Sequence, residues 1–298
     1  MIRLGLCCKF IEEPIRFRTA TVTGLSRLRR GDALERISNL CLHNAGALAA
    51  ALEYCAANGI GDFRVNSQIL PVKSHPQVGY AMSHLPQGKT IVERFRDCGR
   101  FANEHDIRTT FHPDQFILLS SPDAGITRRS IAELKYQVEV AGWIGADVIN
   151  IHGGGAYGDK QAALDRVRRN VDRLPDRIRS RLTFENDDRV YTPADLLPLC
   201  RDLKVPLVYD AHHHRCLPDE LSVEDATEQA VATWNREPVF HISSPRDGWR
   251  SRNPAYHHDY IDPQDFPRCW LALDATVEVE AKAKEKAVRR LRTYLDGM

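Results

Sequence analysis

The sequence predicts a single (β/α)8 barrel, the TIM-barrel fold, over residues 1–298, with a metal site at the C-terminal face. Eight short β-rich runs occur along the chain, and most of them are followed by an amphipathic segment typical of a helix. No linker or low-complexity segment divides the chain, which indicates one domain. Eight β units of this kind favour a closed barrel over an open sheet.

The predicted strands are short apolar or alternating runs that the intervening helical segments separate. They are residues 2–7, 62–69, 108–113, 147–153, 182–187, 206–212, 238–243 and 270–279. Residues 33–59 form one predicted helix, and Asn58 with Gly59 is its C-cap signal. Residues 130–145 form another. The strand-helix alternation is the pattern that a parallel barrel requires.

Composition limits the function classes. The chain is 43% hydrophobic, so it can bury a sizeable core without disulfides. Its eight cysteines contain no C-x-x-C pair, which indicates reduced thiols. We find neither a signal-peptide pattern nor the roughly 20 apolar residues of a membrane span, and we therefore expect a cytoplasmic protein without a membrane partner.

The net charge is +1, from 41 Lys and Arg against 40 Asp and Glu, so a surface that binds nucleic acid must be local. The best candidate is PRDGWRSR (245–252), a loop in which arginine alternates with tryptophan. Arg246, Trp249 and Arg250 there suit phosphate and base-stacking contacts. A plain surface loop is the alternative.

Side chains alternate within the predicted strands, and this alternation separates two faces. In VINIHG (148–153), Ile149 and Ile151 share one face while Asn150 and His152 share the other. The same split between apolar and polar positions recurs in the strands around residues 64, 111 and 184. We expect the apolar face to pack on helices and the polar face to point into the barrel. An ordinary barrel interior would hold Val, Ile and Leu instead.

Potential metal ligands stand at the C-terminal ends of successive predicted strands. They are His112, His152, Glu185, Asp210 and His241, with Glu280 after the last strand. Any one of them could be a satisfied buried polar group, but a whole ring requires a compensating cation. Mixed imidazole and carboxylate ligands suit Mn, Zn or Fe, and their number predicts at least two ions. Paired ions suit phosphate-ester hydrolysis, although other ester hydrolysis and aldose isomerisation use similar ligands.

Seven motifs, in this order along the chain, resemble the UV damage endonuclease (UvdE) family. They are FHPDQF (111–116), IHGGGAYGDK (151–160), FENDD (184–188), DAHHH (210–214), HIS (241–243), HHDYI (257–261) and VEAKAKE (279–285). The resemblance implies a metal-dependent DNA repair nuclease on a TIM barrel. Its substrate would be double-stranded DNA with cyclobutane dimers or 6-4 photoproducts, nicked 5′ to the lesion to leave a 3′-hydroxyl and a 5′-phosphate. We then expect a nucleoid-associated monomer.

Position by position, the resemblance also implies a ligand set for two or three divalent ions. Its members are His75, His112, His152, Glu185, Asp210, His213, His241, His257 and Glu280. The ion implied is Mn2+, with Zn2+, Mg2+ or Co2+ as alternatives. Glu185, Asp210 and Glu280 would be the catalytic anionic ligands, with Glu278 as the rival of Glu280. Lys160 would pair with a phosphate or with a nearby carboxylate, and His212 and His214 would lie outside the ligand shell or in solvent.

The resemblance further implies that Gln115 and Phe116 probe the duplex at the lesion. An aromatic wedge fills the gap that extruded bases leave. The alternative is a hydrophobic loop, residues 116–119, on the barrel rim. Three positions depart from the family pattern: Val239 replaces a lysine found in many members, Leu6 an aromatic residue and Phe10 an asparagine. Alternatives on the same barrel are an abasic-site nuclease or other hydrolase and a sugar isomerase. Val239 adds a catalytically weakened DNA-binding protein as a third.

Overall fold

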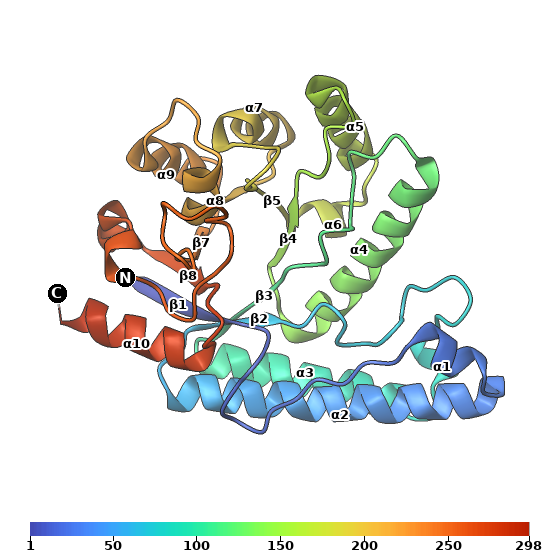
Figure 1. Ribbon diagram of the computed structural model, residues 1–298. Coiled ribbons are helices and arrows are strands. Elements are labelled where there is room, and N and C mark those ends of the chain that lie inside the picture. Colours follow the sequence, from blue (N-terminus) through green and yellow to red (C-terminus); the bar gives the residue numbers. More distant parts are fainter. Residues whose placement is uncertain (298) are drawn as a thin grey trace.

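The structure is a computed structural model that describes residues 1–297, and its centre is a closed barrel of eight parallel strands in the order β1 to β8 (Figure 1). The predicted barrel is therefore confirmed. The strands are β1 (Ile2–Cys7), β2 (Asp62–Val65), β3 (Arg108–Phe111), β4 (Val148–His152), β5 (Leu182–Glu185), β6 (Leu207–Asp210), β7 (Val239–Ile242) and β8 (Ala275–Val279).

The helices surround the barrel, and α2 and α3 run side by side along one flank (Figure 1). The α-helices are α1 (Val22–Ser26), α2 (Arg30–Ala57), α3 (Gly88–Glu104), α4 (Ala124–Ile144), α5 (Lys160–Asp172), α6 (Asp176–Arg179), α7 (Pro193–Leu203), α8 (Ala211–Cys216), α9 (Val223–Val231) and α10 (Glu285–Asp296). The 3-10 helices are η1 (Met82–His84), η2 (Pro263–Asp265) and η3 (Arg268–Ala272). None of the helices in residues 1–297 has the length and hydropathy to cross a membrane.

Two predicted helices end where the sequence signals place their ends, but begin earlier. α2 stops at Asn58, and Gly59 takes the left-handed backbone (φ +66°) that ends a helix without steric cost. α4 ends at Gly145, also left-handed. It begins at Ala124 because the Asp123 carboxylate accepts hydrogen bonds from the backbone N–H groups of Gly125 and Ile126.

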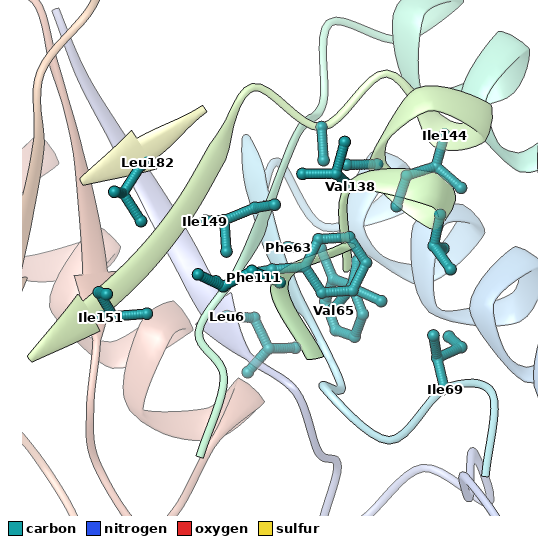
Figure 2. Packing of buried hydrophobic residues seen from close by; sticks show 14 of the residues in the cluster. Leu6, Phe63, Val65, Ile69, Phe111, Val138, Ile144, Ile149, Ile151 and Leu182 are labelled. Carbon is teal, nitrogen blue, oxygen red and sulfur yellow. The ribbon is translucent and has the colours of Figure 1, made fainter. Parts of the chain in front are cut away.

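The main hydrophobic core lies between the strands and the helices. Figure 2 shows the outward side chains of β2, β3 and β4, with Phe63, Phe111 and Ile149 gathered near Val138 and Ile144 of α4. Phe63, Phe111 and Ile149 are fully buried, as the alternation within the strands predicts. At about 1.5–3 kcal/mol for each large apolar side chain, this layer supplies the main stabilisation of the fold.

The predicted strand at 270–279 was too long at its beginning. Residues 268–272 form η3, and β8 starts only at Ala275. Trp270 causes the difference: its ring is fully buried, stacks on Phe240 at 4.7 Å between centroids, and its indole N–H donates to Thr227 Oγ1 (2.9 Å). In a strand, this side chain would point to one face of the sheet and could not reach both Phe240 and Thr227.

The lower part of the barrel interior holds a small apolar cluster on the side of β4, β6 and β7. Val148, Val208 and Val239 are buried together there, and Trp234 packs against them. The guanidinium groups of Arg108 and Arg236 lie 5.9 and 5.2 Å from the Trp234 ring. The three valines and Trp234 form what we call the valine floor, because they lie below the polar upper layer on this side of the barrel.

Candidate metal centre

The strand register sets potential ligands from neighbouring strands at the same level. His152 on β4 is paired with Glu185 on β5, and Asp210 on β6 is paired with His241 on β7. His241 is in turn paired with Glu278 on β8. Residues paired in a parallel barrel point to the same face, so these side chains meet inside it. The structure thereby brings the predicted ring together.

Glu185 is the centre of this ring. Its Oε2 lies 2.7 Å from His112 Nε2, and its Oε1 lies 3.1 Å from His241 Nδ1 and 3.3 Å from His213 Nδ1. Asn150 Nδ2 donates to Oε2 (2.6 Å). Burial opposes ionisation here, but the positive charge of the surrounding imidazoles, His241 first, holds the pKa of Glu185 well below its usual range. The carboxylate is thus a buried anion among cation-binding groups.

Asp210 and His213 are held by α8, the short helix that follows β6. Asp210 caps this helix, because its Oδ1 accepts the backbone N–H of His213 (2.7 Å). Its Oδ2 is buried without a hydrogen-bond partner among residues 1–297 and lies 3.4 Å from His213 Nδ1. Burial lowers the pKa of His213, but Asp210 and Glu185 outweigh it and raise that pKa well above the usual value.

Glu280, rather than its rival Glu278, faces the ligand cluster. Glu280 Oε1 lies 3.5 Å from His241 Nδ1, and its Oε2 lies 3.8 Å from His257 Nδ1. Glu278 lies deeper, where Arg64, Thr110 and His241 Nε2 (2.8 Å) contact its carboxylate. Burial opposes its ionisation, yet Arg64 and His241 lower the pKa of Glu278 to about 2. Glu278 therefore lies beneath the ligand cluster and contacts one of its members, His241.

Three groups of side chains offer ligand atoms that lie within 4.8 Å of one another, and they share members. They are His112–His152–Glu185, His112–His241–Glu280 and Glu185–Asp210–His213. The imidazole nitrogens and carboxylate oxygens suit Mn2+, Fe2+ or Zn2+. The buried Oδ2 of Asp210, which lacks a partner in the described part of the chain, is an oxygen left over for a cation. The residues therefore fit the divalent ions that the sequence predicts.

A cavity of about 440 Å³ opens above the cluster. His112, His152, Glu185, His213 and Glu280 line it. Gln115, predicted to probe DNA, lines it as well, as do Asp187, Asp188 and Arg189, whose role the sequence did not predict. The motif FENDD contains Asp187 and Asp188, so their position after a strand end was the available signal. Gly154 (φ +87°) and Gly155 complete the wall.

Phe116 is the most exposed aromatic side chain near this mouth, with 70% of its surface accessible. It also lines a larger neighbouring cavity of about 700 Å³, and Leu118 borders both cavities. Leu119 is buried in the core, and Ile117 packs partly against it. Of the segment 116–119, Leu119 is therefore packed on the barrel as the hydrophobic-loop alternative predicts, and Phe116 is not.

The loop after β7 carries the predicted DNA-binding residues Arg246, Trp249 and Arg250. It folds back on itself through an antiparallel bridge between Pro245 and His257. Arg246 pairs with Asp247 (2.9 Å), and Arg250 is exposed. The Trp249 indole N–H donates to Asp265 Oδ1 (2.8 Å), which leaves 37% of the residue accessible. The loop lies beside the cluster because His257 Nδ1 is 3.8 Å from Glu280 Oε2, although His257 itself belongs to none of the three ligand groups found in residues 1–297.

The structure does not bring His75 or Lys160 to the cluster. His75 belongs to none of the three ligand groups among the described residues, and its Nδ1 accepts the backbone N–H of Gln77 (3.2 Å). Lys160 Nζ pairs with Asp195 Oδ2 at 2.8 Å near the surface. This contact is the carboxylate alternative that the sequence left open. A loop sets the position of His75 and the beginning of α5 sets that of Lys160, and alternation within strands reports neither.

His212 and His214 are buried, so of the two alternatives that the sequence left open for them, exposure to solvent does not hold. His214 bridges Tyr209 Oη (2.8 Å) and Asp219 Oδ1 (2.9 Å). His212 is fully buried, and neither of its ring nitrogens has a hydrogen-bond partner within residues 1–297. Neither residue belongs to a ligand group found in that part of the chain.

The three departures from the family pattern lie in apolar surroundings. Val239 belongs to the valine floor and offers no ligand atom. Leu6 is fully buried in the core. Phe10 is buried between aromatic rings, with centroids 5.2 Å from Tyr54 and 6.0 Å from Phe63. The substitutions therefore leave the described ring of ligands complete.

Comparison with known proteins decides the family. The family model described as UV-endonuclease UvdE matches residues 2–298. The chain belongs to the UvdE family. Within it, this UvdE chain is 35% identical to the UV DNA damage endonuclease of Bacillus velezensis, over 98% of this chain and 92% of that protein. The resemblance predicted from the seven motifs is confirmed.

Solved structures agree with the fold of this UvdE chain. The crystal structure of SacUVDE matches with a TM-score of 0.89 at 26% identity and covers 100% of this chain and 99% of that one. Endonuclease IV from Thermus thermophilus matches with a TM-score of 0.64, at 18% identity, over 99% and 100% of the two chains. The second likeness concerns the barrel alone.

Proposed function

We propose that this protein is a divalent-metal-dependent endonuclease that nicks double-stranded DNA on the 5′ side of UV lesions. The observation that carries the proposal is the position of Glu185 among His112, His213 and His241, beneath an open cavity, in a chain of the UvdE family. The whole chain would act as one domain. The substrate would carry cyclobutane dimers or 6-4 photoproducts.

The chain's own residues would divide the work between holding ions and holding DNA. Bound divalent ions, Mn2+ in our proposal, would polarise the scissile phosphate and activate water. Glu185, Asp210 and Glu280 would hold them as anions, and His112, His152, His213, His241 and His257 would complete their coordination. Two ions match this set, since Val239 offers no ligand atom where a further one could bind. His75 would act only if DNA binding moved its loop, and Lys160, the first residue of α5, only if DNA binding broke its contact with Asp195.

The rim would hold the DNA. Gln115 lines the cavity and Phe116 projects beside it, so an amide and an aromatic ring could enter the gap left by extruded bases. Arg246 and Arg250 would bind phosphates on the opposite side of the mouth. The absence of side chains at Gly154 and Gly155 would let a phosphodiester approach the ions. The products would be a 3′-hydroxyl and a 5′-phosphate.

A plasmid assay tests the proposal. Supercoiled plasmid, UV-irradiated or untreated, is incubated with purified protein and Mn2+, with and without chelator. We expect relaxation of the irradiated plasmid alone, and only when the metal is present. Sequencing gels on a defined lesion would then show the nick 5′ to it, with ends that a DNA polymerase extends.

The other outcomes separate the alternatives. Cleavage of plasmid with abasic sites, with irradiated plasmid left intact, would indicate an abasic-site nuclease. Conversion of aldoses with all DNA intact would indicate a sugar isomerase. DNA that is retarded in a gel but remains uncut would indicate a binding protein. Sedimentation of the active protein tests the expected monomer, and its distribution in cells tests the expected association with the nucleoid.

A further inference from the structure

We propose that Trp249 is a positioning residue for the metal centre, acting through His212 on His257. The inference rests on the proposed function, in which His257 is a metal ligand. Among the candidate ligands that the three groups and their neighbours contain, His257 stands apart because a long loop carries it. The other candidates stand on or directly after strands or, as His213 does, on α8. A ligand on a loop needs neighbours that fix its direction.

The loop itself brings Trp249 and His257 together. Besides the Pro245–His257 bridge, the Arg246 N–H donates to the Tyr256 carbonyl (2.6 Å), and the His258 N–H donates to the Ser244 carbonyl (2.8 Å). The loop therefore leaves β7 and returns as a short antiparallel ribbon. Along the sequence, Trp249 lies between the two paired segments of this ribbon. His257 lies at the base of the ribbon, beside Glu280.

Asp265 anchors the tryptophan. Its Oδ1 accepts the Trp249 indole N–H (2.8 Å), and its Oδ2 accepts a hydrogen bond from the hydroxyl of Ser244, the first residue of the ribbon. Asp265 is itself buried in η2. One carboxylate thus binds the first residue of the ribbon and its tryptophan, and the indole is held in one place although part of it remains accessible.

His212 fills the space between the tryptophan and the candidate ligand. Its ring centroid lies 5.1 Å from Trp249 and 5.3 Å from His257, and it meets the His257 ring nearly edge to face, at 80°. Neither ring nitrogen of His212 has a hydrogen-bond partner among the described residues. Its contacts with both neighbours are therefore ring packing, which fixes a side chain by shape.

The consequence is a row of rings, Trp249–His212–His257, that ends at the Glu280 carboxylate. Removing the first ring frees the second, and the imidazole of His257 then loses the surface that orients it. Partners outside the ligand shell of a metal site typically change metal affinity about 10–100-fold when they are removed. We expect the row to affect metal binding before it affects folding, because Trp249 lies at the edge of the molecule.

The test measures Mn2+ binding directly, by the EPR signal of free Mn2+ during titration of chelator-treated protein without DNA. Trp249→Ala should weaken binding of at least one ion about tenfold or more. His212→Phe keeps a ring between its neighbours and should bind within about threefold of the wild type, whereas His212→Ala should resemble Trp249→Ala. Tyr256→Ala is the matched control, since this aromatic residue of the same loop stacks on Arg246 at 5.0 Å.

Each outcome supports or overturns the proposal. The proposal would be overturned if Trp249→Ala bound Mn2+ with wild-type affinity. It would also be overturned if His212→Phe lost as much Mn2+ affinity as Trp249→Ala, because that result would indicate that His212 is itself a ligand. Should Trp249→Ala fail to fold, Trp249→Phe, which keeps the ring but not the bond to Asp265, should still weaken binding, and unchanged affinity would count against the proposal. Failure of the wild type to bind Mn2+ at all would instead remove the proposed function.

Discussion

His241 Nδ1 lies 3.1 Å from Glu185 Oε1, in the fully buried interior of the barrel. Burial disfavours a charged imidazole, but Glu185 and Glu278 raise the pKa of His241 to about 10, against an ordinary value of 6.5. The ring therefore holds a proton at neutral pH when no metal ion competes for its nitrogens. This relationship makes the stability of chelator-treated protein depend on pH.

The first prediction follows from the direction of that shift. A raised histidine pKa contributes stability that is complete below pH 6.5 and is lost as the pH rises through about 10. Urea unfolding of chelator-treated protein should therefore give a free energy of unfolding that falls by at least about 1 kcal/mol between pH 7 and pH 10. His241→Asn should flatten this decline. An equally steep decline in the variant would show that other groups cause it.

The second prediction concerns Glu185. Glu185→Gln keeps the shape of the side chain but removes its charge, so it should reduce nicking of irradiated plasmid at least about 100-fold, more than the loss of a supporting residue typically costs. Glu185→Ala should also abolish nicking. Circular dichroism should show an unchanged barrel. Glu104→Gln, an exposed change at the end of α3, is the control and should nick normally. Substantial activity of the Glu185 variants would remove this carboxylate from the mechanism.

The third prediction concerns the wedge. Phe116→Ala should lower the preference for irradiated over untreated plasmid about 5–150-fold, the range that corresponds to stacking of about 1–3 kcal/mol per base. The melting temperature should hardly change, since the side chain is 70% accessible. Leu271→Ala, an exposed apolar residue of η3 that precedes β8, is the control. Unchanged preference in Phe116→Ala would exclude the probing role.

The fourth prediction concerns a carboxyl group inside the barrel. Asp62 is fully buried on β2, and neither oxygen has a hydrogen-bond partner in residues 1–297. Burial, with the charge of Glu278, raises the pKa of Asp62 well above 3.8, so the folded state loses stability as the pH rises above that value. Asp62→Asn should raise the free energy of unfolding at pH 7 by about 1–3 kcal/mol.

The gain in Asp62→Asn should shrink at pH 3, below the ordinary carboxyl pKa of 3.8, where the acid in the unfolded chain is largely protonated. Urea titrations at both pH values measure it. Asp172→Asn, at the exposed end of α5, removes an equal charge and should leave the free energy of unfolding within about 0.5 kcal/mol of wild type. A destabilised Asp62→Asn protein at pH 7 would mean that another group stabilises the charged form of Asp62.

Much of the site was predictable because strands obey a simple rule. Period-two alternation placed Asn150 and His152 inside the barrel and Ile149 and Ile151 outside it, and the burial of both isoleucines agrees. The C-terminal ends of all strands in a parallel barrel lie at one face. Polar residues at these ends could therefore be predicted to lie close together in space. The family resemblance supplied His213 and His257, which strand parity could not.

Contacts that depend on loops or cross the barrel were not predictable. Alternation places Arg64 inside, but its contacts with Glu278 and Glu280 join residues more than 200 positions apart. The packing of His212 against Trp249 depends on how a loop folds back. The beginning of one predicted strand forms η3 instead, because Trp270 packs against Phe240 and donates a hydrogen bond to Thr227, which belong to other elements. Each case is decided by tertiary packing rather than local pattern.

The valine floor and the cavity above Glu185 lie on opposite sides of the ligand cluster. Because apolar side chains lie below the ring on the side of β4, β6 and β7, we expect ions, water and nucleic acid to reach the ring through the cavity above Glu185. A DNA duplex bound across that opening would block it. Ions loaded beforehand should then resist extraction by chelator for as long as the DNA stays bound, and ions added afterwards should reach the ring only when the DNA leaves.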